Sequence, residues 1–161
     1  KTDETYRNGK VLNHRIYYTK TKDFKTFTPS ALLYEPGFSV IDASIVAADV
    51  GYAMFVKDET QNPPAKNLLV TTSENIEGPW RTLSNPITSS AYWSEGPTAC
   101  KIGDNWFMYF DKYRLKKSGL FISKDLEHWT DASDKLHMPG VIRHGTVLKV
   151  KREILNKLLE L

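Results

Sequence analysis

Cysteine is nearly absent from the sequence: Cys100 is the single one among 161 residues. One thiol excludes an intrachain disulfide, so buried apolar side chains and backbone hydrogen bonds must hold the fold together. Cys100 lies in a run of alternating apolar residues, where we expect it to be a small buried apolar side chain. The chain is long enough for one domain with its own core.

Long apolar runs and long basic runs are also missing. No stretch has the length of a transmembrane helix or the pattern of a signal peptide. The 22 Lys and Arg residues nearly balance 19 Asp and Glu residues, and the densest basic group, Lys20, Lys22 and Lys25, is interrupted by Asp23. Such a group is typical of a solvated turn, so we expect neither a nucleic acid nor a membrane as a partner.

Three segments of the chain follow one plan. Each begins with an apolar, strand-like run that ends in Thr or Ser, continues through a polar turn and reaches an aromatic residue. Fifteen residues after each aromatic residue, a polar residue opens a new apolar run. The segments are 16–28, 68–81 and 119–130, their aromatic residues are Phe27, Trp80 and Trp129, and the polar residues are Asp42, Glu95 and His144.

This repeat indicates the blades of a β-propeller. Further apolar runs, 51–56 and 105–110, occupy matching places in two of the units. One unit then holds four short strands in about fifty residues, as a four-stranded antiparallel blade does. A helical repeat would place apolar residues at i, i+3, i+4 and i+7, and a β-sandwich would not require the constant spacing.

We therefore predict an all-β fold, a partial propeller of about three blades with a short C-terminal helix. The chain begins at Lys1 without a methionine and holds too few strands to close a propeller, which indicates a fragment or half of an assembly. Unpaired blade edges predict self-association. In one domain, 1–161, we expect the end of a blade at 1–40, blades at 41–92 and 93–140, a first strand at 141–150 and an amphipathic helix at 151–161 packed on the edge of the propeller.

The equal spacing places Asp42, Glu95 and His144 at one position of successive blades, so we expect them to converge in a concave site. Two neighbouring carboxyl groups cannot both ionise freely, and the pKa of one of them rises. Glu95 has the longer side chain and follows Tyr92 and Trp93, whose rings could exclude water from it. We therefore predict that Glu95 donates a proton, that Asp42 orients it, and that His144 binds substrate, water or a metal.

Three sequence motifs resemble those of glycoside hydrolase family 43. SEGP at 94–97, followed by an apolar run and DNWFMYF at 104–110, resembles the segment that carries the general acid of that family. IDAS at 41–44 is similar to its strand with the pKa-modulating aspartate, and RHGTV at 143–147 to its segment with an axial histidine. The resemblance covers nearly all of the chain from about Arg15 onward.

The resemblance implies a five-bladed propeller and an O-glycosyl hydrolase that inverts the sugar centre of xylose- or arabinose-containing plant polysaccharides. Glu95 would be the general acid, Asp42 its pKa modulator, and Phe38, Trp93, Arg143 and His144 would bind the oligo- or polysaccharide. No cofactor would be required. A structural calcium ion or a water would lie in the channel near His144, and the protein would be secreted or periplasmic.

The chain departs from the family pattern in one respect. The family places its catalytic base, an aspartate, at the start of the first blade, which would precede Lys1. Asp3 lies in a polar terminus and is a poor substitute. Since inverting hydrolysis needs an acid and a base, we expect this chain alone to be inactive or nearly so.

Two other functions remain open from the sequence. A non-catalytic sugar-binding propeller would use Phe38, Tyr92 and Trp93 to stack on sugar rings. A protein-interaction propeller would ignore sugars and would not raise the pKa of Glu95.

Overall fold

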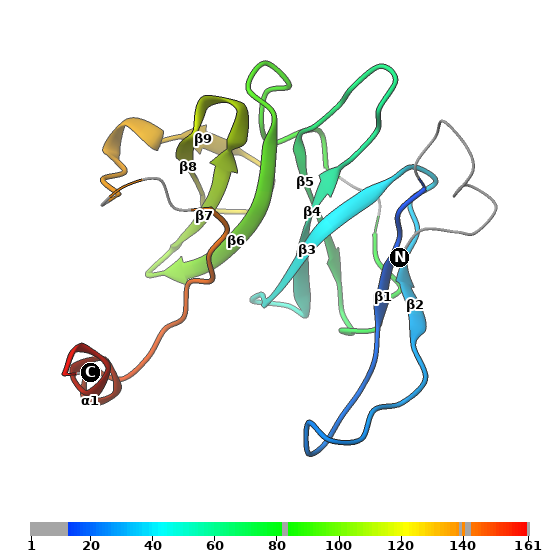
Figure 1. The fold of residues 1–161 in the computed structure, drawn as a ribbon, viewed down its shortest axis with the longest axis horizontal. Coiled ribbons are helices and arrows are strands. Elements are labelled where there is room, and N and C mark those ends of the chain that lie inside the picture. The colour runs from blue at the N-terminus through cyan, green and yellow to red at the C-terminus, as the bar shows by residue number, and fades with distance from the viewer. Residues whose placement is uncertain (1–12, 82–83, 139, 141–142, 161) are drawn as a thin grey trace.

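The computed structural model describes residues 13–81, 84–138, 140 and 143–160. They form three antiparallel sheets that stand side by side in chain order (Figure 1). Within these ranges, no helix has the length and apolar character needed to cross a membrane. The elements are β1 (Ile16–Tyr18), β2 (Ala31–Tyr34), β3 (Val40–Ala47), β4 (Tyr52–Asp58), β5 (Leu68–Ser73), β6 (Ser94–Ile102), β7 (Asn105–Lys112), β8 (Lys117–Ser123), β9 (Trp129–Asp131), α1 (Arg152–Leu159) and two 3₁₀ turns, Tyr113–Leu115 and Ser133–Lys135.

Each sheet is a meander, in which strands that follow one another in the chain are hydrogen-bonded neighbours. The turns that close the first and last sheets are built alike. The Asp23 and Asp125 carboxylates each accept the backbone N–H groups two and three residues later. This is the local bonding for which aspartate is favoured in turns. The repeated polar turn of the sequence is therefore a repeated backbone structure.

Two apolar clusters hold the sheets together, one on each face of the middle sheet. Successive strand residues point to opposite faces, so Phe55 of β4 packs toward the last sheet while Met54 packs toward the first. The first cluster comprises Ala53, Phe55, Leu68, Val70, Ala99, Met108, Phe110 and Phe121, and the second Tyr34, Val40, Met54, Val56 and Leu69.

The predicted all-β class, the successive antiparallel sheets and the short C-terminal helix are confirmed. One strand of the middle unit was predicted wrongly, because its sheet has three strands among the described residues and not four. Its outer segment still follows β5, where the N–H groups of Arg81, Ser84 and Ile87 donate to the carbonyls of residues 72, 70 and 68. Donors spaced by three residues do not match the two-residue period of a strand. The division into blades and the closure into five stay predictions.

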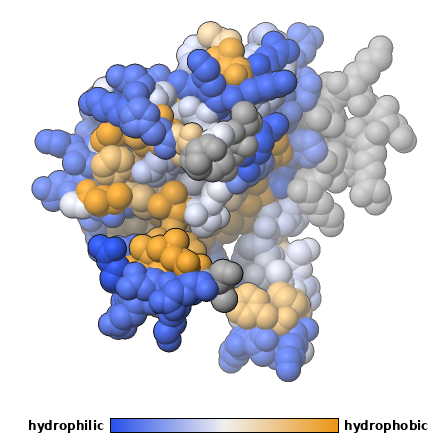
Figure 2. Space-filling view, turned by 60° about the vertical axis from the view of Figure 1, so that its left-hand side comes forward, coloured by the Kyte–Doolittle hydropathy of each residue, from blue (hydrophilic) through white to orange (hydrophobic). Residues whose placement is uncertain are grey.

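The C-terminal segment differs from the expectation at two points. Residues 141 and 142 lie outside the described residues, and 143–150 form no strand although one was predicted at 141–150. Helix α1 is present, but every described residue from 143 to 160 is exposed, so the predicted packing on the sheet edge is wrong. Figure 1 shows the extended segment carrying α1 away from the sheets, and Figure 2 shows apolar side chains gathered on one side of the helix. Periodicity predicts a helix and its apolar side, but not the surface that covers it.

Candidate active site

The site is built on two β-bulges at the same place in two sheets. Pairing of β3 with β4 shifts between Ile41 and Ser44, and pairing of β6 with β7 shifts between Glu95 and Thr98. Inside the bulges, Asp42 has φ 54° and Gly96 has φ 60°. Bulges bend a strand and redirect its side chains, and they are frequent next to active sites.

Asp42 and Glu95 were predicted to occupy equivalent positions, but the strand pairing shows that they are one position apart. Ile41 pairs with Lys57, and Glu95 pairs with Asp111 at the corresponding place. Glu95 therefore matches Ile41, and Asp42 matches Gly96. The connection into the last sheet is one residue longer than the connection into the middle sheet. Ile41 lies fourteen positions after Phe27, whereas Glu95 lies fifteen positions after Trp80. Because Asp42 and Glu95 both lie fifteen positions after an aromatic residue, their spacing alone does not reveal the extra residue.

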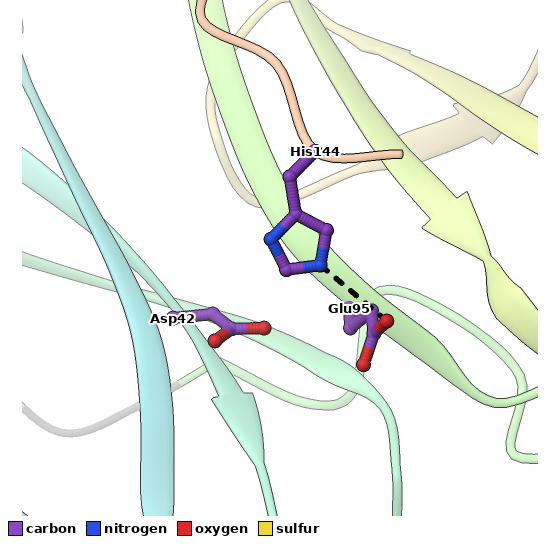
Figure 3. Close-up of side chains that lie close together, drawn as sticks. All are labelled: Asp42, Glu95 and His144. Carbon is purple, nitrogen blue, oxygen red and sulfur yellow. Dashed lines mark ion pairs between the residues drawn. The ribbon is translucent and has the colours of Figure 1, made fainter. Parts of the chain in front are cut away.

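Asp42, Glu95 and His144 nevertheless come together, as predicted. One carboxylate oxygen of each acid and one ring nitrogen of the histidine lie within 4.8 Å of one another. Figure 3 shows the three side chains reaching toward a common point from β3, from β6 and from the C-terminal segment. Their roles in catalysis stay predictions.

A cavity of about 370 Å³ opens beside this point, and Asp42 and His144 line it but Glu95 does not. Three triplets of consecutive residues line it: 42–44, 96–98 and 144–146. Each triplet ends in a hydroxyl residue, Ser44, Thr98 or Thr146, so corresponding positions of three segments surround one space. The volume lies in the range of small-ligand sites, roughly 300–1,000 Å³.

Asp42 connects the two bulges. Its Oδ2 accepts a hydrogen bond of 3.0 Å from the backbone N–H of Gly96. A Cβ at position 96 would lie 2.9 Å from the His144 ring, and the φ of this residue also favours glycine. Asp42 thus fixes the backbone next to Glu95, which is consistent with an orienting role.

Glu95 is surrounded by three nitrogen-bearing side chains, of which Lys57 and Arg143 are cationic. Its Oε2 is 3.2 Å from Nζ of Lys57, and its Oε1 pairs with the guanidinium of Arg143. His144 Nε2 is 3.4 Å from the same Oε1. The Glu95 side chain is 14% exposed, so water screens these contacts only partly.

The predicted rise in the pKa of Glu95 is wrong. Burial raises this pKa and is the largest influence, but the hydrogen bond and charge of Lys57 lower it, as do the His144 hydrogen bond and the Arg143 charge. Their combined effect places the pKa of Glu95 below its usual value. A neighbouring carboxyl group alone would raise the pKa of Glu95, but Lys57 and Arg143 contact Glu95 and outweigh it.

Two residues of the site, Lys57 and Asp111, were not predicted. They occupy matching positions on β4 and β7, and both side chains are buried, at 4% and 7% exposed. Asp111 Oδ2 accepts hydrogen bonds from Arg143 Nε at 3.1 Å and from the His144 backbone N–H at 3.0 Å. A usable signal was present, because each is the charged residue directly after the apolar run 51–56 or 105–110.

The predicted sugar-binding aromatics do not line the cavity. Phe38 is half-buried and packs against the second apolar cluster. The Arg114 guanidinium lies 3.4 Å from the centre of the Trp93 ring and covers that ring face. Tyr92 stacks on Phe110 with ring centres 6.4 Å apart. Arg143 and His144, in contrast, meet Glu95 directly.

The donor set does not fit a calcium ion bound directly by Glu95. Calcium takes six to eight oxygen ligands, whereas both Glu95 oxygens already face Lys57, Arg143 and His144. A cation would have to displace these groups and would be repelled by the charges of Lys57 and Arg143. A metal near His144, held through water, stays a prediction.

Comparison with known proteins agrees with the motifs. A family model described as a probable glycosyl hydrolase domain, related to glycoside hydrolase family 43, matches residues 1–156 of the 161. A search of curated proteins finds no match to the chain.

Proposed function

The chain belongs to the family of probable glycosyl hydrolase domains, and on that premise we propose that it carries the proton-donating part of an inverting glycoside hydrolase. The substrate class is polysaccharide that contains xylose or arabinose, as the resemblance to family 43 implies. The supporting observation is the meeting of Asp42, Glu95 and His144 beside a cavity of about 370 Å³ that Asp42 and His144 line.

In the proposed reaction, Glu95 gives its proton to the glycosidic oxygen while the bond between this oxygen and the sugar carbon breaks. A water activated by a second carboxylate attacks the opposite face of the sugar. Such carboxyl pairs stand roughly 6.5–9.5 Å apart to admit the water. The base is assigned to none of the described residues. Asp42 orients Glu95 through the backbone of Gly96.

Glu95 has to hold a proton when the substrate is bound. Arg143 is the cation that can leave most easily, because its side chain is 55% exposed whereas that of Lys57 is 4% exposed. A sugar that displaces Arg143 from Oε1 removes one positive charge and excludes water, and both changes raise the pKa of Glu95. The displaced guanidinium can then donate hydrogen bonds to sugar hydroxyls.

The test measures turnover of xylo- and arabino-oligosaccharides in the presence of azide. Azide can attack the sugar carbon in place of the activated water, so turnover to glycosyl azide requires only the acid. We expect Glu95→Gln to lower this turnover by about 10²- to 10⁴-fold, the usual contribution of a general acid. Glu127→Gln makes the same change at an exposed turn and should leave turnover unchanged. Equal turnover by the two variants would refute the role of Glu95.

The ion pairs of Glu95 favour a second candidate, a sugar-binding domain without hydrolysis. A carboxylate with a lowered pKa is a good acceptor for sugar hydroxyls and a poor proton donor. Calorimetry with the same oligosaccharides separates the candidates. Binding by the unmodified chain, with no product in azide or water, supports the binding domain.

A further inference from the structure

A chain of alternating charges runs through the site and beyond it. Each charged side chain in it contacts one or two side chains of the opposite sign, and Lys57 stands near its middle. Ion-pair distances are 2.6 Å from Lys66 to Glu59, 2.9 Å from Glu59 to Lys57, 3.2 Å from Lys57 to Glu95 and 3.1 Å from Arg143 to Asp111, with Arg143 also paired to Glu95.

Lys57 is the buried link between two sheets. It lies near the end of β4 in the middle sheet, and its partner Glu95 lies on β6 in the last sheet. Its ammonium also stands 4.7 Å from the centre of the Tyr113 ring. A buried ammonium needs paired carboxylates, and Glu59 and Glu95 supply them. The Lys57 side chain is 4% exposed, so it is not placed to touch a sugar.

The two oxygens of Glu95 therefore have different surroundings. Oε2 faces the buried ammonium of Lys57. Oε1 faces Arg143 and His144, whose side chains are 55% and 52% exposed. A cation faces each oxygen, but the buried Lys57 cannot move away from Oε2, whereas the exposed Arg143 can be displaced from Oε1 by a substrate.

We propose that Lys57 is a positioning residue, which holds Oε2 of Glu95 and leaves Oε1 as the oxygen that carries the proton to the substrate. This rests on the proposed function of Glu95 as general acid. The alternative is that Lys57 serves only its ion pair with Glu59 and its contact with the Tyr113 ring, and does not hold Glu95. The two roles differ in what happens to the protonation of Glu95 when Lys57 is replaced.

The test is a carbon-detected NMR titration of the Glu95 carboxyl in the 161-residue chain, with Glu95→Gln used to assign the signal. Lys57→Met keeps a long apolar side chain and removes the charge, and it should raise the Glu95 midpoint by about one pH unit or more. Lys57→Arg restores the charge and should return the midpoint most of the way. Besides Lys57, the groups that face Glu95 from the elements around it are Asp42, Asp111, Tyr113, Arg143 and His144, and these stay unchanged in each variant.

Lys66→Met is the matched control. Lys66 is equally buried, at 4% exposed, but it pairs with Glu59 and not with Glu95. Lys66→Met should change the titration midpoint of Glu95 by no more than a few tenths of a pH unit, because the Glu59 carboxylate and Lys57 lie between Lys66 and Glu95 in the chain of charges. Equal shifts in Lys57→Met and Lys66→Met, or no shift in either, would overturn the proposal.

If Lys57→Met does not fold, Glu59→Gln provides a second test of the same contact. It removes the other carboxylate of Lys57, which then pairs with Glu95 alone, so the Glu95 midpoint should fall further. A rise or no change contradicts the proposal. These titrations need no turnover, and a failure of the proposed hydrolysis appears separately in the azide assay.

Discussion

The middle sheet and the last sheet are two copies of one repeat with different surroundings. In β4 every residue from Ala53 to Lys57 is buried, because sheets cover both of its faces. In β7, buried residues such as Met108 alternate with half-buried ones such as Phe107 and Tyr109. The same strand of the repeat is thus buried without interruption where both faces are covered, and mostly at alternate residues where a single face is.

The same two sheets also differ in charge next to their bulges. Paired positions hold Ile41 and Lys57 in one sheet and Glu95 and Asp111 in the other, so the charge next to the bulge changes sign. Because the sheets pack against each other, Lys57 of one copy meets Glu95 of the next. A repeated backbone therefore supplies the positions, and divergence between the copies supplies an acid and its counter-ion.

Removal of Phe55 should have the largest effect on stability. Its side chain is fully buried between the two sheets and meets the Trp129 ring edge-on, with ring centres 5.8 Å apart. We expect Phe55→Ala to lower the free energy of unfolding by about 4 kcal/mol, measured by urea titration. Phe24→Ala is the control at an 86% exposed position and should change it by about 0.5 kcal/mol or less. Equal losses would mean that the two sheets do not share a core.

The turns that lead into β4 and β7 should respond differently to the same substitution. Gly51 has φ 72°, and a Cβ there would lie 2.1 Å from the Ser73 carbonyl oxygen, whereas Gly103 has φ 58° with open space around it. Both Gly→Ala changes incur the left-handed backbone cost of about 1–2 kcal/mol. Gly51→Ala adds a clash with backbone and should lose about 1–3 kcal/mol more. Urea titration of both variants checks this, and equal losses would contradict the close approach of residue 51 to β5.

Alkaline pH should weaken the contact between the first sheet and the middle sheet. Burial raises the pKa of Tyr34 to about 12, with a hydrogen bond to Thr71 acting in the opposite direction. Between pH 10 and 12 the unfolded chain loses the Tyr34 proton while the folded chain keeps it, so stability falls as pH rises. A pKa difference of two units between the folded and the unfolded chain lowers the free energy of unfolding by at most about 2.7 kcal/mol. Urea titrations across this range should show a smaller alkaline loss in Tyr34→Phe, and an unchanged loss would exclude Tyr34 as its source.

Much of the fold could be predicted from the sequence, because its signals are local. Neighbouring residues determine the polar turns around Asp23 and Asp125 and the apolar runs of β4 and β7. The absence of a fourth strand among the described residues of the middle unit could not be predicted, since whether the 81–87 segment keeps the spacing of a strand depends on how it meets β5.

The site was predicted at the level of position but not of electrostatics. Asp42, Glu95 and His144 share one spacing in the sequence and come together in the structure, although Glu95 lies one position away from the equivalent of Asp42. The state of Glu95 depends on Lys57, which lies 38 positions away in the chain and reaches it across a sheet boundary. Spacing within a repeat does not reveal which charges meet between repeats.

The smallest effect is expected where the two sheets meet at the surface. Nζ of Lys101, next to the turn that precedes β7, lies 2.6 Å from both carboxylate oxygens of Asp49 in the turn that precedes β4. These side chains are 30% and 75% exposed, so water and salt screen the pair. A double-mutant cycle with Lys101→Met and Asp49→Asn should give a coupling of about 0.2–1 kcal/mol that shrinks at high salt. A larger, salt-independent coupling would show that the surface turns join the sheets as strongly as a buried contact does.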